Sequence, residues 1–216
     1  MVGPVLRDDL FSLVVRFRMH KIAIMADIGK MYRQIRIHPS DYPLHRILWR
    51  NSSHEPLRTF ELMTVTYGTA SAPYLATKCL KELSVQEGTL CPLASSVLEN
   101  DFFMDDMLTG VNTAEEGEEL YNQLRQLLQS GGFNLRKWAS NSSTVLSKIP
   151  FELCDGRSLF TLDVDPTPIK ALELQWEPSV DRFRYSVPEC SQETTLTRRV
   201  VLSDTAKLYD PRCGTV

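Results

Sequence analysis

The chain has no apolar run that approaches the roughly 18 residues a helix needs to span a bilayer. Its first residues, MVGPVLRDDL, contain no basic segment followed by an apolar core, so we expect no signal peptide there. The five cysteines are an odd number and form no Cys-x-x-Cys pair, which favours reduced thiols in an intracellular, cytoplasmic protein. Together these absences predict a protein without a membrane partner or a disulfide framework.

The sequence also lacks the spacing of a zinc site, an internal repeat and a low-complexity tract. Its four histidines stand at positions 20, 38, 45 and 54, and the last two flank a predicted strand instead of sharing one helical face. Structural zinc sites need ligands at short, regular spacings. We therefore expect no zinc.

What is present suits one globular domain, or one domain with a small appendage, because 43% of the 216 residues are hydrophobic. The net charge of −3 is a weak argument against a nucleic-acid partner, but the charge is unevenly distributed. Residues 1–60 carry ten Lys and Arg against five Asp and Glu, whereas residues 61–130 carry three against eleven. A backbone-binding face beside a cation site would give this pattern. Charge alone favours the simpler interpretation, which is uneven scatter over a solvated surface.

Apolar periodicity predicts helices and strands in the first half of the chain. Residues 8–19 place apolar side chains at helical spacing, and an aspartate at the start of this stretch can cap the helix. The stretch IAIMAD at 22–27 has the pattern of a short buried strand. Residues 60–67 follow a strand pattern, and a helix should run over 73–83 from a proline in its first turn.

A hairpin is expected over residues 97–110. Thr-Ala-Glu-Glu at 113–116 is a capping-box pattern, and the helix behind it should stop at Gly131-Gly132 before a strand over 132–138. This order predicts an α+β fold, an antiparallel sheet covered on one face by two helices. Further expected elements are a strand at 46–50, a second hairpin made of 171–176 and 181–187, and a last helix over about 195–209.

Two aspartates, Asp105 and Asp106, stand side by side between apolar residues in FFMDDMLTG. Adjacent carboxylates repel each other, and a tight turn normally prefers Asn-Gly or Asp-Gly. A divalent cation removes the conflict, because magnesium takes a few carboxylate oxygens, keeps waters and accepts further oxygens from a phosphate. Asp27 ends a strand of the same predicted sheet and can supply a third carboxylate, and two cations would suit in-line displacement at phosphorus. The alternative is a solvated turn, with Asp27 as an ordinary strand end or helix cap.

Four stretches of sequence, taken in order, are similar to a known family. They are ADIGKMYRQI at 26–35, TYGTASAPYLA at 66–76, FFMDDMLTG at 102–110 and GGFNLRKWASN at 131–141. Together they resemble the palm motifs of a reverse transcriptase, most closely those of BEL/Pao-type LTR retrotransposons, and FMDD resembles the aromatic-x-Asp-Asp box. The flanking stretches LFSLVVRFRMHKIAI, DYPLHRILWR and RRVVLSDTAKLYDP extend the resemblance over roughly residues 3–211.

The resemblance implies a reverse-transcriptase palm with an antiparallel sheet, helices on one face, and truncated fingers and thumb. It implies a palm with partial fingers over residues 1–176, and a hairpin remainder with a truncated thumb over residues 177–216. One position departs from the family pattern: Glu173 stands where the family usually has a Leu-Gly step that resembles a primer grip.

The resemblance also implies a metal site. Asp27, Asp105 and Asp106 match the family's catalytic, metal-binding carboxylates, with Mg²⁺, or Mn²⁺ in its place, as the cofactor. In the family the positions of Asp27 and Asp105 are the direct ligands, and the position of Asp106 is more peripheral. The main-chain carbonyl of Ile28 would lie close to the second metal.

The nucleotide-binding positions implied by the resemblance are Tyr32, Tyr67, Gly68 and Lys137. Tyr32 matches a steric gate, because a ring under the sugar leaves no room for the 2′-hydroxyl that distinguishes ribonucleotides. Gly68 would let the main chain approach the nucleotide or template closely, and Lys137 could neutralise triphosphate charge or donate a proton. Ordinary core packing for Tyr32 and a surface strand position for Lys137 are the alternatives.

The function implied is an RNA-directed DNA polymerase domain of a retrotransposon polyprotein, which transfers nucleotides to a primer 3′-end by two-metal chemistry. Its partners would be an RNA or DNA template with a primer and deoxynucleoside triphosphates, with a virus-like particle or the nucleus as further locations. The truncated ends and Glu173 motivate an alternative, a non-catalytic remnant that at most binds nucleic acid or a partner. A metal-binding structural domain is a third hypothesis.

Overall fold

The structure is a computed structural model that describes residues 3–155, 169–171, 174–184, 197–200 and 202. Contacts divide the chain into two compact units, which are described separately. The first unit consists of Met1–Asp8, Asp27–Met107 and Glu119–Leu135, and the second of Asp9–Ala26, Leu108–Glu118 and the residues from Arg136 onward. The predicted division of the chain at residue 176 stays a prediction.

The described part of the chain contains both helices and antiparallel strands, so the predicted α+β class is confirmed. The helices are α1 (Leu10–Phe17), α2 (Met31–Gln34), α3 (Ala72–Glu87), α4 (Pro92–Asn100), α5 (Ala114–Ser130) and α6 (Ser143–Leu146). The strands are β1 (Ile22–Ile28), β2 (Arg46–Trp49), β3 (Arg58–Glu61), β4 (Phe102–Phe103), β5 (Asp106–Val111), β6 (Leu135–Ser140), β7 (Ile169–Ala171), β8 (Leu174–Glu177) and β9 (Arg182–Arg184). Three short 3₁₀ helices cover Pro39–Leu44, Gly88–Leu90 and Phe151–Leu153.

The main sheet has the strand order β4-β5-β1-β6. At one end of β1, Ile28 N–H donates to the carbonyl of Asp105. At the other end, a Cβ placed on Gly110 would lie 2.6 Å from the carbonyl oxygen of Ile22. Because the residue numbers rise on one strand as they fall on the other, β1 and β5 run antiparallel. The antiparallel sheet predicted from the sequence is therefore confirmed.

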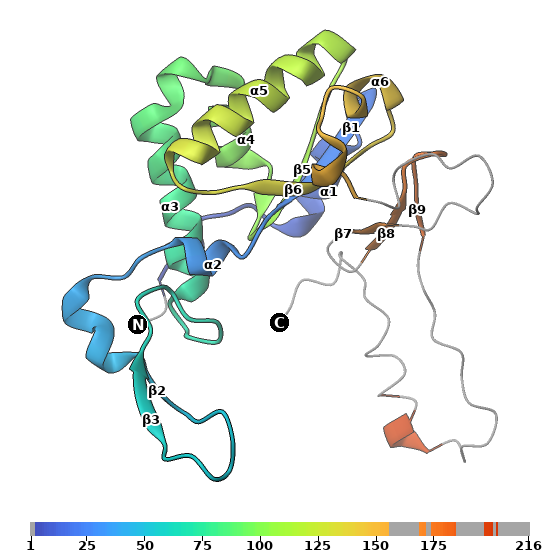
Figure 1. The fold of residues 1–216 in the computed structure, drawn as a ribbon. Coiled ribbons are helices and arrows are strands. Elements are labelled where there is room, and N and C mark those ends of the chain that lie inside the picture. Colours follow the sequence, from blue (N-terminus) through green and yellow to red (C-terminus); the bar gives the residue numbers. More distant parts are fainter. Residues whose placement is uncertain (1–2, 156–168, 172–173, 185–196, 201, 203–216) are drawn as a thin grey trace. The chain divides into compact units, whose positions relative to one another are not determined.

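In the first unit, helices α3 and α4 lie side by side (Figure 1). Small side chains allow the two helices to pack closely: Ala76 of α3 and Ala94 of α4 are both fully buried. Buried Ser84 donates to Glu99 Oε1 at 2.8 Å and lies 2.9 Å from the hydroxyl of Ser95, which satisfies a polar group inside the helix pair. The predicted helix over 73–83 is confirmed and extends further at both ends.

Two strand predictions in the first unit are wrong in detail. Residues 97–100 belong to α4 instead of a hairpin, and Pro92 in the first turn of that helix was the signal that the strand interpretation missed. The strand predicted at 60–67 is regular only over β3, which pairs with β2 and not with the main sheet. Beyond β3 the chain makes single ladder bonds, such as Val65 N–H to Ile35 O at 2.9 Å.

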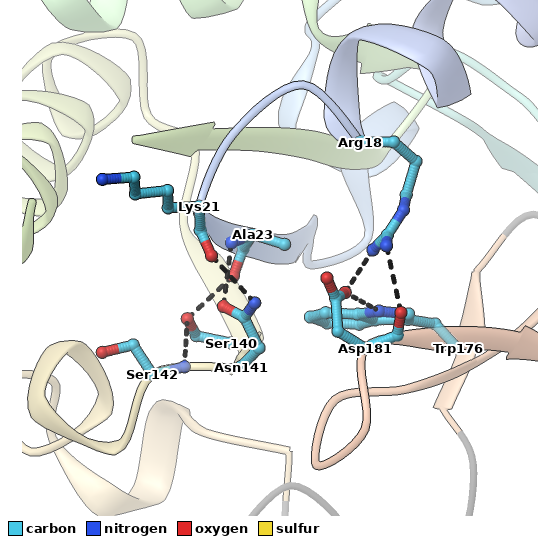
Figure 2. Close-up of polar contacts among 8 residues, drawn as sticks. All are labelled: Arg18, Lys21, Ala23, Ser140, Asn141, Ser142, Trp176 and Asp181. Carbon is cyan, nitrogen blue, oxygen red and sulfur yellow. Dashed lines mark hydrogen bonds and ion pairs between the residues drawn. The ribbon is translucent and has the colours of Figure 1, made fainter. Parts of the chain in front are cut away.

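The second unit contains α1 and the small sheet β7-β8-β9. Asp9 caps α1 as predicted by accepting from Ser12 N at 3.0 Å. The Phe17 ring at the end of α1 meets the buried Trp176 ring edge to face, with centroids 5.2 Å apart. Figure 2 shows Asp181 accepting from Trp176 Nε1 at 3.0 Å and pairing with Arg18. These contacts attach the small sheet to α1.

Side chains of the WASN stretch fasten β6 to the start of β1 (Figure 2). Buried Ser140 donates its hydroxyl to Ala23 O at 2.7 Å. Asn141 accepts from Ala23 N at 2.9 Å and donates to Lys21 O at 3.1 Å. Because the start of β1 is bonded to the end of β6, these two strands also run antiparallel.

The capping box before α5 is confirmed. Glu116 N–H donates to Thr113 Oγ1 at 3.2 Å, and Thr113 N–H donates to Glu116 Oε2 at 3.2 Å. The helix ends before Gly132, whose φ of +78° is the left-handed conformation that glycine adopts without steric cost. Strand β6 follows, somewhat later than the 132–138 predicted.

The predicted second hairpin is confirmed as β8 and β9. Of the predicted last helix, residues 198–200 and 202 are helical, Thr197 is described and is not helical, and the other residues lie outside the described ones, as do Glu173, Cys190 and Cys213. Cys79, Cys91 and Cys154 are free thiols. Within the described ranges, no helix combines the length and the apolar character needed to cross a membrane.

Two glycine substitutions test the close packing of β5 on β1. A Cβ on Gly110 would lie 2.6 Å from the Ile22 carbonyl, so Gly110→Ala should lower the free energy of unfolding by about 2–3 kcal/mol. Gly132→Ala meets no atom within 4 Å and has only the positive φ to oppose it, so it should cost about 1 kcal/mol. Urea denaturation measures both. A Gly110→Ala loss no larger than that of Gly132→Ala would contradict the described strand packing.

Candidate functional site

The paired aspartates lie at a two-residue hairpin turn. Phe103 pairs with Asp106 across β4 and β5, so Met104 and Asp105 alone form the loop. Met104 has a φ of +61°, which is uncommon for a residue with a long side chain and costs of order 1–3 kcal/mol. The sequence analysis placed both aspartates in the turn, whereas Asp106 is the first residue of β5.

The end of β1 lies directly beside this turn. Ile28 N–H donates to Asp105 O at 2.8 Å, which brings the peptide that follows Asp27 against the backbone of Asp105. Asp105 is exposed, and Asp27 and Asp106 are half-buried. The structure therefore brings together the strand end and the turn that the sequence analysis expected to meet.

The two adjacent aspartates are not equivalent. Asp105 is a turn residue with an exposed side chain, whereas Asp106 begins β5 and is half-buried. Among the described residues, no group of three or more His, Cys, Asp or Glu side chains is arranged to hold a metal ion. Asp27, Asp105, Asp106 and the neighbouring main-chain carbonyls supply oxygens of the kind that a hard cation prefers.

Two tyrosines pack together in the same unit. The rings of Tyr32 and Tyr67 meet edge to face with centroids 4.8 Å apart. Their backbones converge because Val65 N–H bonds to Ile35 O. Gly68 follows with a φ of +82°, and a Cβ there would meet no atom within 4 Å, so the glycine serves the backbone conformation and leaves its surroundings open.

Tyr32 also lies within electrostatic reach of the turn. Burial raises the pKa of its phenol above the ordinary value of 10.0, and the Asp105 carboxylate raises that pKa further. The Arg7 guanidinium acts in the opposite direction, and Tyr67 adds a smaller upward shift of the same pKa. The first, second and third motifs of the sequence analysis therefore meet around Tyr32, with Arg7 beside them.

The sequence analysis did not single out Arg7. Its guanidinium carbon lies 4.3 Å from the centroid of the Phe103 ring, and one of its N–H groups contacts Met104 Sδ. No local pattern marks this residue, because an arginine before a helix is ordinary; only the fold brings it to the turn. Lys137, by contrast, is exposed in β6 and belongs to the second unit, so its predicted role stays a prediction.

Comparison with known proteins adds no further assignment. No protein-family model matches the chain, and the search of curated proteins finds no significant relative. The assignment of a function therefore depends on the motifs and the local geometry described above.

The environment of Tyr32 generates a pH prediction. Because the folded pKa of Tyr32 lies above its ordinary value, the stability linked to this group is fully present below about pH 10 and is lost as pH rises through the folded pKa. Asp105→Asn should lower the Tyr32 pKa, because it removes a negative neighbour, and Arg7→Gln should raise it. Ring resonances of Tyr32, followed by NMR with pH and assigned with Tyr32→Phe, measure both shifts. Shifts in the same direction would contradict the described positions.

Proposed function

We propose that this chain is the palm region of an RNA-directed DNA polymerase, which extends a primer 3′-end with deoxynucleoside triphosphates. The observation that carries the proposal is the bond from Ile28 N–H to Asp105 O, because it brings the end of the Asp27 strand to the Asp105 turn. Two motifs that are separate in the sequence thereby supply residues to one region, and the contact of the Tyr32 and Tyr67 rings adds a third motif.

The strand arrangement supports the same proposal. The hairpin β4-β5 lies next to β1, so the turn with Asp105 and the strand end with Asp27 belong to neighbouring strands of one sheet. The costly φ of Met104 also lies at this turn, and strained backbone is concentrated at functional sites. A purely structural hairpin would be better served by glycine or asparagine at that position.

Magnesium fits the donor set near the turn. Asp27 and Asp105 would hold the ion with the main-chain carbonyl of Ile28, and Asp106 would contribute its charge from a more peripheral position. When bound, magnesium supplies charge neutralisation at the attacking and leaving oxygens of the displacement. In that reaction the primer 3′-oxygen forms a bond to the α-phosphorus, and the bond to the departing pyrophosphate breaks.

The protein's own residues would bind and select the nucleotide. The Tyr32 ring, supported edge-on by Tyr67, would lie against the sugar, where a 2′-hydroxyl would collide with it. Gly68 leaves open space for the main chain to approach a base or a sugar. In this proposal, discrimination between deoxynucleotides and ribonucleotides depends on the rigid packing of the Tyr32 ring more than on any hydrogen bond.

One observation favours a second candidate, a non-catalytic fold that binds nucleic acid or a partner. In the part of the chain that the structure describes, no group of three or more His, Cys, Asp or Glu side chains is arranged to hold a metal ion. A domain of this kind would bind primer–template in a salt-dependent manner without incorporating nucleotides.

Primer extension on an RNA template with magnesium distinguishes the two candidates. The native chain should incorporate deoxynucleotides, and Asp105→Asn/Asp106→Asn should reduce the rate by at least about 10²–10³, the usual effect of removing electrostatic stabilisation from a transition state. Glu115→Gln, which removes an exposed charge in the first turn of α5 and keeps the capping residue Glu116, is the surface control and should retain activity. Equal extension by the native chain and the Asp105/Asp106 variant would refute the catalytic proposal.

Substitution of Tyr32 tests the nucleotide-binding part of the proposal. Tyr32→Ala removes the ring and should reduce discrimination against ribonucleotides by up to about 10², while Tyr32→Phe keeps the ring and should leave discrimination unchanged. The measurement is the ratio of kcat/KM for a deoxynucleotide and the matching ribonucleotide. If Tyr32→Ala discriminates as well as the native chain, Tyr32 is ordinary core packing.

A further inference from the structure

Arg7 is a half-buried cation without a carboxylate partner among the described residues. Its guanidinium is stacked over the Phe103 ring with 4.3 Å between the guanidinium carbon and the ring centroid. The one hydrogen-bond acceptor it meets in the described part of the chain is the sulfur of Met104. A thioether sulfur is a weak acceptor, so most of the donor capacity of this guanidinium is unused.

A half-buried guanidinium in this position would be stabilised by a bound anion. Withdrawing a cation from water carries a desolvation cost that a ring face and a sulfur atom offset only in part. Guanidinium presents five N–H groups in a planar fork that matches the oxygens of a phosphate, often two at a time. The contact with the Phe103 ring holds the guanidinium beside the turn, and Met104 Sδ engages one of its five N–H groups.

The surroundings identify which anion is suited to this place. Arg7 contacts the turn residue that precedes Asp105, and its charge reaches Tyr32, the expected sugar-binding ring. All of these residues belong to the first unit. We propose that Arg7 binds a phosphate group of the incoming nucleotide, beside the Asp105 turn and Tyr32.

This inference rests on the proposed polymerase function for the identity of the anion, but it can be tested apart from catalysis. Inorganic tripolyphosphate carries the phosphates of a nucleotide without base or sugar. Its binding to the full chain can be measured by calorimetry in the presence of a chelator, where metal-mediated binding makes no contribution.

Arg7→Gln should weaken tripolyphosphate binding by about tenfold, because it removes charged hydrogen bonds to the anion. Arg7→Lys keeps the charge but loses the planar fork, and should weaken binding by about threefold. Arg125→Gln on the exposed side of α5 is the matched control for loss of one positive charge and should bind as the native chain does. Native affinity in Arg7→Gln, or an equal loss in Arg125→Gln, would overturn the proposal.

A second comparison separates phosphate binding from simple support of the turn. If Arg7 only supports Met104 and Phe103, Arg7→Gln will lower the thermal unfolding temperature and leave tripolyphosphate affinity unchanged, which would overturn the proposal. The proposal requires the same tenfold loss on Arg7→Gln in an Asp105→Asn background. Disappearance of that loss would show that Arg7 acts through Asp105 and would also overturn it. Failure of primer extension alone would refute the polymerase function and leave this binding result unaffected.

Discussion

The site depends on one main-chain hydrogen bond, from Ile28 N–H to Asp105 O. It joins the last residue of β1 to a turn residue that lies far along the sequence. Because both groups belong to the main chain, the bond does not depend on the side chain at either position, unless proline replaces Ile28. An unpaired amide at this position would carry the full cost of desolvation, so the pairing is enforced wherever the sheet forms. Asp27 and Asp105 are near each other because β1 and β5 have this register, and β1 is held on its other edge by the contacts of Ser140 and Asn141 with Ala23.

Two energetic costs coincide at the hairpin turn. Met104 adopts a left-handed φ, and the next two residues are both acidic. Packing alone gives no reason for either choice, since asparagine or glycine would form the turn more easily. Sequences that break local rules at one point generally do so for function. In the two proposals, a cation would offset the charge of Asp105 and an anion would offset the charge of Arg7, both at the same turn.

The local elements were predictable from the sequence because their signals are local. Asp9 as the cap of α1, the Thr113–Glu116 capping box and the buried strand IAIMAD all follow from spacing within a few residues. The strand predicted at 60–67 was displaced because its partner is β2, a pairing that periodicity does not encode. Helix α4 was missed because Val97 and Leu98 suit either a strand or a helix, and only Pro92 indicated the difference. Arg7 was not predictable, since its role arises from a contact with residues distant in the chain.

The most direct test of the account is detection of the Ile28–Asp105 hydrogen bond in solution. NMR can observe the scalar coupling through a hydrogen bond, from the amide nitrogen of Ile28 to the carbonyl carbon of Asp105, in a deuterated, isotope-labelled chain without metal. The account predicts a measurable coupling between these two nuclei and slow exchange of the Ile28 amide proton with water. No coupling together with rapid exchange of that proton would mean that the Asp27 strand end and the Asp105 turn do not meet, and would contradict the site itself.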